Sequence, residues 1–235
     1  MRDVVVVGGG RFGLEVVTYL HDLAKSGAAP AVRGVIDDSS PDLSDFPGGV
    51  RQIGSLSDWD PEGFDHIIAI GDSAVRWKVA ALLRDRSARF LSMIHPTAYV
   101  ADTAEIGPGA VICPLAFVGP YARMGAHGVI NVQASLGHDA RLGTAAVLSP
   151  GAKVSGRGEI GEGAFLGTLA VMTPGSKLGA FSKLAAGSVW FGNAPDGALV
   201  VGNPGKSRVM FRVPEGVSVS PTRERRIDSE EPLSQ

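Results

Sequence analysis

The feature that most constrains the fold is a column of large apolar residues at every sixth position from Val100 to Trp190. A second column, two residues earlier in each hexad, runs from Ala98 to Ser188 and contains only Ala, Gly and Ser. Because 44% of the chain is hydrophobic, sixteen consecutive matches would arise by chance about once in 10⁵. Period six fits neither an α-helix nor an alternating strand, and it is typical of a β-helix built from hexapeptide repeats.

Such repeats place one large and one small side chain of each hexad inside a triangular coil of about 18 residues. Successive coils stack about 4.8 Å apart, so that backbone N–H and C=O groups pair between coils. We expect the small column to turn the corners, and the 32 glycines of the chain suit such corners. The pattern predicts an all-β parallel β-helix over residues 95–192. The period alone does not fix the hand of the coil.

The composition indicates an ordinary globular chain. Its 235 residues allow two modest domains, and a net charge of −2 gives no general attraction to nucleic acid or membrane. A single cysteine, Cys113, excludes an intrachain disulfide and suggests a reducing compartment. We see no signal peptide and no apolar run of transmembrane length, so we expect a cytoplasmic location.

Residues 1–94 have the pattern of a small α/β, Rossmann-like domain. A buried strand at Val4–Val7 precedes a glycine turn and a helix at Leu14–Lys25. Gly8, Gly10 and Gly13 fit the G-x-G-x-x-G spacing, which lets a backbone approach a phosphate at a helix N-terminus. The domain is about half the size of a full dinucleotide-binding fold, so a mononucleotide or nucleotide-linked ligand is favoured over NAD.

Three further strands are expected in this domain, at Val32–Ile36, His66–Ile70 and Phe90–Ile94. The carboxyl ends of parallel strands meet at one edge of the sheet, where such sheets bind ligands. The candidate binding residues at this edge are Gly10, Arg11, Phe12, Gly13, Asp37, Asp38, Gly71 and Asp72.

Two segments follow the repeats. Residues 193–213 leave the hexad period, and their cations Lys206 and Arg208 are either ordinary surface charges or partners for the phosphates of a ligand. Residues 214–235 are polar, charged and interrupted by proline, so we expect a disordered tail.

His138 is the candidate catalytic residue within the repeats. It lies two places after Leu136, outside the core and near a corner, and Asp139 follows it directly. It is either a surface histidine beside an acid or a general base whose ring is oriented by a carboxylate. The side chains of neighbouring residues on a strand point to opposite faces, so direct contact between His138 and Asp139 would require a bent corner.

Six segments in order resemble the bacterial sugar acetyltransferases of the NeuD/PglD type, over about residues 1–210. They are VVVVGGGRFGLEV, GVIDD, AIGDSAVR, SMIHPTAYV, INVQASLGHDARLG and VVGNPGKSRV. The resemblance implies a left-handed coil, a homotrimer and acetyl-CoA bound between neighbouring prisms. It also implies that His138 is the base and Asp139 its acidic neighbour.

The same resemblance assigns the ligand-binding residues. It implies that Gly10–Gly13 contact phosphate, that Asp37 and Asp38 lie at the nucleoside end, and that Gly71 with its following turn lies at the diphosphate. Arg11 and Phe12 depart from the usual pair, and Val147 stands where some relatives have a second histidine near the coenzyme. Residues 18 apart stack, so Gly156 should lie over His138, while Thr168 and Ala186 lie on another edge. The predicted acetyl-CoA contacts are Val147, Gly156, Thr168, Ala186, Lys206 and Arg208.

The resemblance, taken with these patterns, implies an acetyl-CoA-dependent acetyltransferase that modifies the amine of a nucleotide-linked amino sugar by direct transfer, and we expect no metal. O-acetylation of sialic acid or another sugar is an alternative that the sequence does not separate. A zinc carbonic anhydrase on the same coil is disfavoured, because His127 and His138 do not stack. A non-catalytic scaffold that binds nucleotide sugars is the remaining alternative.

Overall fold

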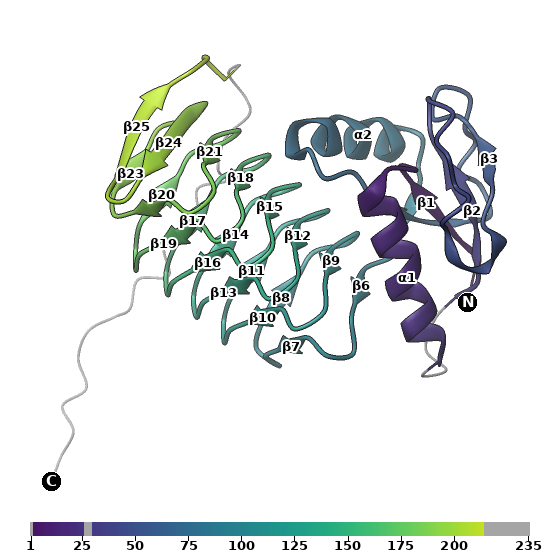
Figure 1. Ribbon diagram of the computed structural model, residues 1–235, viewed down its shortest axis with the longest axis horizontal. Helices are drawn as coiled ribbons and strands as arrows, with labels where there is room; N and C mark the ends of the chain where they lie inside the picture. The colour runs from purple at the N-terminus through teal and green to yellow at the C-terminus, as the bar shows by residue number, and fades with distance from the viewer. Residues whose placement is uncertain (1, 26–29, 214–235) are drawn as a thin grey trace, which may run out of the picture.

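The computed structural model describes residues 2–25 and 30–213, so the predicted tail at 214–235 lies outside the described residues. An α/β domain stands beside a β-solenoid, and its two helices face one side of the solenoid (Figure 1). Neither described helix is long and apolar enough to cross a membrane.

The N-terminal sheet is parallel, with strand order β3-β2-β1-β4-β5. Its central strand consists of four valines that are at most 1% exposed, as the sequence predicted. The amide of Leu14 donates to the Gly10 carbonyl at 3.1 Å, so the first helix begins directly after the glycine turn, three residues earlier than expected. The elements are β1 (Val4–Val7), α1 (Arg11–Lys25), β2 (Val32–Ile36), η1 (Pro47–Gly49), β3 (Gln52–Gly54), β4 (Asp65–Ile68), α2 (Ser73–Asp85) and β5 (Arg89–Phe90).

The strand expected at Phe90–Ile94 is divided between the two domains. Its first part, β5, pairs with β4, whereas β6 (Met93–Ile94) pairs with β9 of the solenoid. The prediction of one continuous strand was therefore wrong, because Met93 is buried on the solenoid instead of extending the N-terminal sheet. The short strand β3 was not predicted either, since its residues are largely exposed and carry no apolar alternation.

The solenoid has three sheets that run along its length. We name the first the helix-facing sheet: β6, β9 (Val111–Ile112), β12 (Val129–Ile130), β15 (Val147–Leu148), β18 (Phe165–Leu166), β21 (Lys183–Leu184), β24 (Ala198–Gly202) and the antiparallel β25 (Gly205–Val209). The stacked-aromatic sheet contains β7 (Tyr99–Val100), β10 (Phe117–Val118), β13 (Ser135–Leu136), β16 (Lys153–Val154), β19 (Val171–Met172) and β22 (Val189–Trp190). The charged sheet contains β8 (Glu105–Ile106), β11 (Arg123–Met124), β14 (Arg141–Leu142), β17 (Glu159–Ile160), β20 (Lys177–Leu178) and β23 (Asn193–Ala194).

Both hexad columns point into the solenoid, as predicted. Ile130, Leu136 and Leu148 are fully buried and pack with Ala134 and other members of the small column in one continuous core. The corners, however, are turned by the residue that precedes each small one. From Gly109 to Gly187 that residue has a positive φ, as at Gln133 (57°) and Asp139 (58°), so the bend does not depend on the small column as expected.

The two domains share a core and a set of polar contacts. On the apolar side, Val16 and Val17 of α1 belong to the same buried cluster as Val111, Val129 and Val147 of the helix-facing sheet. On the polar side, α2 lies along the corner between the charged and helix-facing sheets. There the buried Arg76 donates to the carbonyls of His127, Ile68 and Ile70, and the Ser73 hydroxyl donates to the Gly163 carbonyl at 2.6 Å.

Candidate active site

His138 and Asp139 are in direct contact at a solenoid corner. They lie between β13 and β14, and Asp139 adopts φ 58°, which bends the chain and turns its carboxylate back towards the ring. His138 Nδ1 lies 2.8 Å from Asp139 Oδ2. A hydrogen bond donated by Nδ1–H leaves Nε2 unprotonated, and this nitrogen can accept a proton from a substrate. The bent corner that the sequence analysis required is therefore present.

Gly156 provides the space for this imidazole. A Cβ atom built on Gly156 would collide with the His138 ring, at Nε2 and Cε1. The stacking of Gly156 on His138 is as predicted from the 18-residue period. The gap that a glycine leaves at this position is filled by the catalytic candidate itself.

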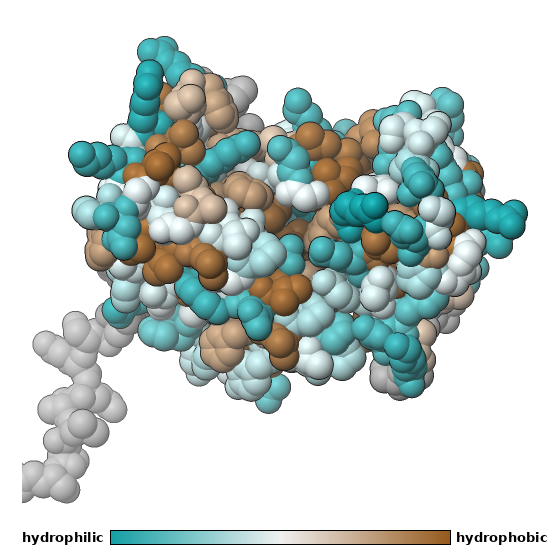
Figure 2. Space-filling model, viewed as in Figure 1, coloured by the Kyte–Doolittle hydropathy of each residue, from teal (hydrophilic) through white to brown (hydrophobic). Residues whose placement is uncertain are grey.

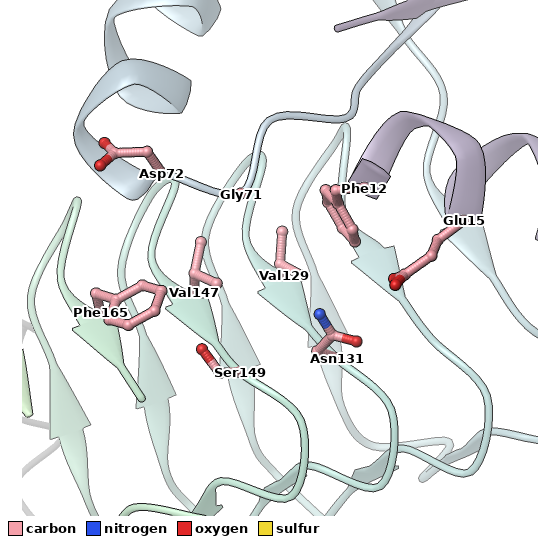
Figure 3. A pocket seen from close by; sticks show the side chains of 9 residues that line it. All are labelled: Phe12, Glu15, Gly71, Asp72, Val129, Asn131, Val147, Ser149 and Phe165. Carbon is pink, nitrogen blue, oxygen red and sulfur yellow. The ribbon is translucent and has the colours of Figure 1, made fainter. Parts of the chain in front are cut away.

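An open cavity of about 440 Å³ lies between the α/β domain and the helix-facing sheet (Figure 3). Its upper wall comes from α1 and from the loop before α2, and its floor comes from β12, β15, β18 and the corner residues that follow the first two. The lining residues are Phe12, Glu15, Gly71, Asp72, Val129, Asn131, Val147, Ser149 and Phe165. Three predicted nucleotide-sugar contacts and the predicted coenzyme contact Val147 therefore share one cavity.

The glycine turn is held by an acid from the second strand. The Gly9 amide donates to Asp37 Oδ2 at 2.7 Å, while Oδ1 accepts from the amide and hydroxyl of Ser39. Partial burial raises the pKa of Asp37, but the hydrogen bonds from Gly9 and Ser39 together outweigh it, so the pKa is lowered and the carboxylate stays charged. Gly13 packs against the Gly8 carbonyl so closely that a Cβ atom would collide with it, whereas Gly10 faces open space. Gly10 is thus the glycine of this turn that a ligand can approach.

The other predicted nucleotide contacts have protein partners. Arg11 pairs with Asp45 at 2.8 Å on the surface, and Asp38 accepts from the Ser57 amide at 3.0 Å. Asp72 caps α2, because its Oδ1 accepts from the amides of Ala74 and Val75 at 2.9 Å.

The predicted coenzyme residues occupy three places. Gly156 is at the His138 corner, whereas Thr168 and Ala186 are exposed at the corner between the helix-facing and stacked-aromatic sheets. Lys206 and Arg208 are exposed on β25. Within one chain, these groups do not converge on a single cavity.

The cavity and His138 lie on different sides of the solenoid. The cavity opens on the helix-facing sheet, and its polar floor residues Asn131 and Ser149 lead into the corner towards the stacked-aromatic sheet. His138 stands at the next corner, between the stacked-aromatic and charged sheets. In a triangular cross-section that corner is opposite the helix-facing sheet.

The sequence analysis missed five of the lining residues: Glu15, Val129, Asn131, Ser149 and Phe165. One signal could have revealed two of them. The position directly after each large core residue is glycine in eight of the sixteen hexads and polar in only four, and two of those four are Asn131 and Ser149 beneath the cavity.

Cys113 is not available for covalent catalysis. It is fully buried beneath the α/β domain, and burial raises the pKa of its thiol to about 12. Residues 2–25 and 30–213 contain no cluster of three or more His, Cys, Asp or Glu side chains placed to hold a metal ion.

Comparisons with known proteins agree with this architecture. The PglD N-terminal domain family matches residues 3–83. PerB from Caulobacter crescentus, solved with CoA and GDP-perosamine, is 30% identical, with a TM-score of 0.77 over 88% of this chain and 97% of that one. The acetyltransferase domain of PglB from Neisseria gonorrhoeae is 29% identical (TM-score 0.78; 88% and 100% covered), and WeeI from Acinetobacter baumannii is 26% identical (0.76; 88% and 100%). A search of curated protein sequences gave no match.

The fold and the site define an acyltransferase, with a left-handed β-helix of hexapeptide repeats and a Rossmann-like N-terminal domain. The 30% sequence identity to PerB, over 97% of that protein, also identifies the family. The chain belongs to the NeuD/PglD-type sugar acetyltransferases.

Proposed function

We propose that the protein transfers the acetyl group of acetyl-CoA to the amine of a nucleotide-linked amino sugar, with His138 as the general base. The observation that carries this proposal is the His138–Asp139 pair at an exposed corner, with Nδ1 engaged and Nε2 free to accept a proton. The similar PerB was solved with CoA and GDP-perosamine, also with a histidine replaced by asparagine or alanine.

The proposed active site is shared between copies of the chain in a homotrimer. The cavity corner and the His138 corner are the two edges of the stacked-aromatic sheet. If three copies turn this sheet towards a threefold axis, the cavity edge of one copy meets the His138 edge of the next. Thr168 and Ala186 on the first edge and Gly156 on the second would then line the same cleft.

Exposed apolar side chains support this choice of face. Tyr99 and Phe117 stack on the sheet with ring centroids 5.3 Å apart, and Leu115, Tyr121 and Leu169 are 57–64% exposed at its edges. By contrast, the charged sheet carries solvated ion pairs such as Glu105–Arg123 and Glu159–Lys177. Apolar surface of the first kind is typical of contacts between subunits.

The proposed reaction is a direct transfer. The substrate amine attacks the thioester carbonyl carbon while His138 Nε2 of the neighbouring chain takes the amine proton. Asp139 stabilises the resulting imidazolium. The tetrahedral intermediate then collapses as the carbon–sulfur bond breaks, and the imidazolium returns its proton to the departing CoA sulfur. The high pKa of the buried Cys113 thiol disfavours an acyl-enzyme route.

The cavity favours an amine over sialic acid as the acceptor. Among the described residues that line it, Glu15 and Asp72 are acidic and none is Lys, Arg or His. A sialic acid carboxylate would meet two acids without a compensating cation, whereas an amino sugar would not.

A turnover assay on a panel of nucleotide sugars tests the proposal. We expect CoA release that depends on a 4-amino sugar, with His138→Ala reducing kcat at least about 100-fold and leaving oligomeric state and ligand binding intact. Asp139→Asn should reduce kcat at least about tenfold, because Asn accepts the same backbone conformation but stabilises an imidazolium poorly. Near-normal turnover by His138→Ala would remove the base assignment, and product only at a sugar hydroxyl would replace N- by O-acetylation. Nucleotide-sugar binding without any CoA release would leave the scaffold alternative.

A further inference from the structure

Glu15 lines the cavity at a point for which the proposed function so far gives no role. It lies three residues after Phe12 on α1, so both side chains project from the same side of the helix (Figure 3). Its carboxylate extends from α1 towards the solenoid floor, where Asn131 lies. It therefore stands on the solenoid side of the cavity, away from the glycine turn.

The position of Glu15 distinguishes it from the other acid of the cavity. Asp72 is engaged by two amides at the N-terminus of α2. The Glu15 carboxyl is hydrogen-bonded by the Tyr19 hydroxyl, one helical turn further on, and has no cationic partner among the described residues. The Glu15 side chain is exposed to solvent in the single chain, and desolvation by the atoms around it raises the pKa of the carboxyl.

The polar groups nearest to Glu15 complement a sugar. The Asn131 Oδ1 atom accepts from the Val132 amide at 2.7 Å, which leaves the Asn131 side-chain NH₂ group to donate to a ligand. The Ser149 hydroxyl lies one coil further along the same floor. Phe165 is half-buried and provides apolar surface for the carbon face of a pyranose ring, while Val129 and Val147 are buried in the floor beside it. Glu15 is the one lining group of this part of the cavity that carries a negative charge.

We infer that Glu15 is a specificity-determining residue that binds the ammonium group of the acceptor sugar and selects it over a hydroxyl. The inference rests on the proposed function and deepens it. At neutral pH an alkyl amine binds as an ammonium, whose N–H groups donate to the carboxylate in a charge-assisted hydrogen bond. The ammonium loses one proton to bulk water before it attacks, and His138 Nε2 of the neighbouring chain accepts the second proton as the carbon–nitrogen bond forms.

A thermodynamic cycle isolates this contact. Dissociation constants are measured by calorimetry for pairs of sugars that differ only in a 4-amino or 4-hydroxy group, carried on GDP, UDP and dTDP. GDP-perosamine and GDP-rhamnose form the first pair. The full-length wild type is compared with Glu15→Gln, which keeps the shape and the hydrogen bond to Tyr19 but removes the charge. Glu62→Gln removes the same charge from an exposed position in the same domain and serves as the matched control.

We expect the wild type and Glu62→Gln to prefer the amino sugar by at least about tenfold, and Glu15→Gln to lose that preference while binding the hydroxy sugar normally. A preference that persists in Glu15→Gln overturns the inference, and so does a wild type that shows no preference in any pair. Acetyl transfer by the wild type is scored separately. If transfer to an amine occurs but Glu15→Gln keeps the preference, the Glu15 assignment fails and the proposed function stands. Absence of transfer to every amino sugar would reject the proposed function itself.

Discussion

Gly156 shows how one missing side chain shapes the site. The backbone φ of Gly156 is not in the left-handed region, so an alanine can adopt the chain conformation here. The Cβ atom of that alanine, however, would occupy the space of the His138 ring. We expect Gly156→Ala to displace the imidazole and reduce kcat at least about tenfold, with a loss of stability of no more than about 1 kcal/mol. Steady-state kinetics and thermal unfolding check both effects. Unchanged kcat would show that the ring position over Gly156 is not needed for turnover.

Individual residues of the site were predictable to different degrees. The contact between His138 and Asp139 depends on a positive φ at a corner, and the sequence analysis could state only that such a bend was required. Asp37 was predicted to meet a ligand, yet its oxygens hold the Gly9 amide and Ser39 in this structure. The hydrogen-bond partners of such side chains depend on the exact path of a loop, which hydrophobic patterns do not encode.

Helix α2 fixes the α/β domain to the solenoid through buried polar contacts. Arg76 is fully buried, bridges carbonyls of both domains, and lies one turn beyond the Gly71–Asp72 wall of the cavity. Trp77 adds an edge-to-face contact with Phe181 at 5.6 Å and a hydrogen bond to Glu162 at 3.2 Å. These buried contacts join the two domains directly beside the cavity.

We expect Arg76→Met to lower the free energy of unfolding by about 2–4 kcal/mol, because the carbonyls that Arg76 caps lose their donors. The same change should raise KM for the nucleotide sugar several-fold and leave KM for acetyl-CoA nearly unchanged, since only the α/β wall is loosened. Denaturant unfolding and steady-state kinetics measure these effects.

Arg84→Met is the matched control for this prediction. Arg84 lies on the same helix but is 70% exposed, and its contact with Asp85 is a surface ion pair. We expect a change of at most about 0.5 kcal/mol and normal kinetics. An equal effect on both Michaelis constants in Arg76→Met would contradict a local role for the joint.

At the element scale, the sequence predicted what recurs and missed what occurs once. Each solenoid strand follows from a six-residue period that is repeated along the segment, so single exceptions do not obscure it. The chain passes from the N-terminal sheet at β5 to the solenoid at β6 only once, and the short strand β3 also occurs only once. Neither feature belongs to a sequence repeat that would reveal it. Their pairing is decided by tertiary contacts, which override weak local preference.

The whole molecule sets His138 and the cavity on different sides of one solenoid, so the proposed reaction requires a second chain to complete the site. We expect a particle of about 73 kDa in solution, three times the 24.3 kDa chain, as measured by light scattering. A particle of monomer mass with full activity would contradict a shared site.

Mixed trimers test the sharing directly. His138→Ala removes the proposed base, and Gly71→Trp fills the cavity from a position whose surroundings are open, so each variant alone should be inactive. If each site joins the cavity of one chain to His138 of the next, random mixing in equal amounts restores a site in about one case in four. This value is the chance that a His138→Ala chain provides the cavity and a Gly71→Trp chain provides the base. Co-expressed and tandem-purified mixtures should thus recover about a quarter of wild-type kcat per site. A site contained within one chain would recover nothing, because every chain in the mixture carries one of the two defects.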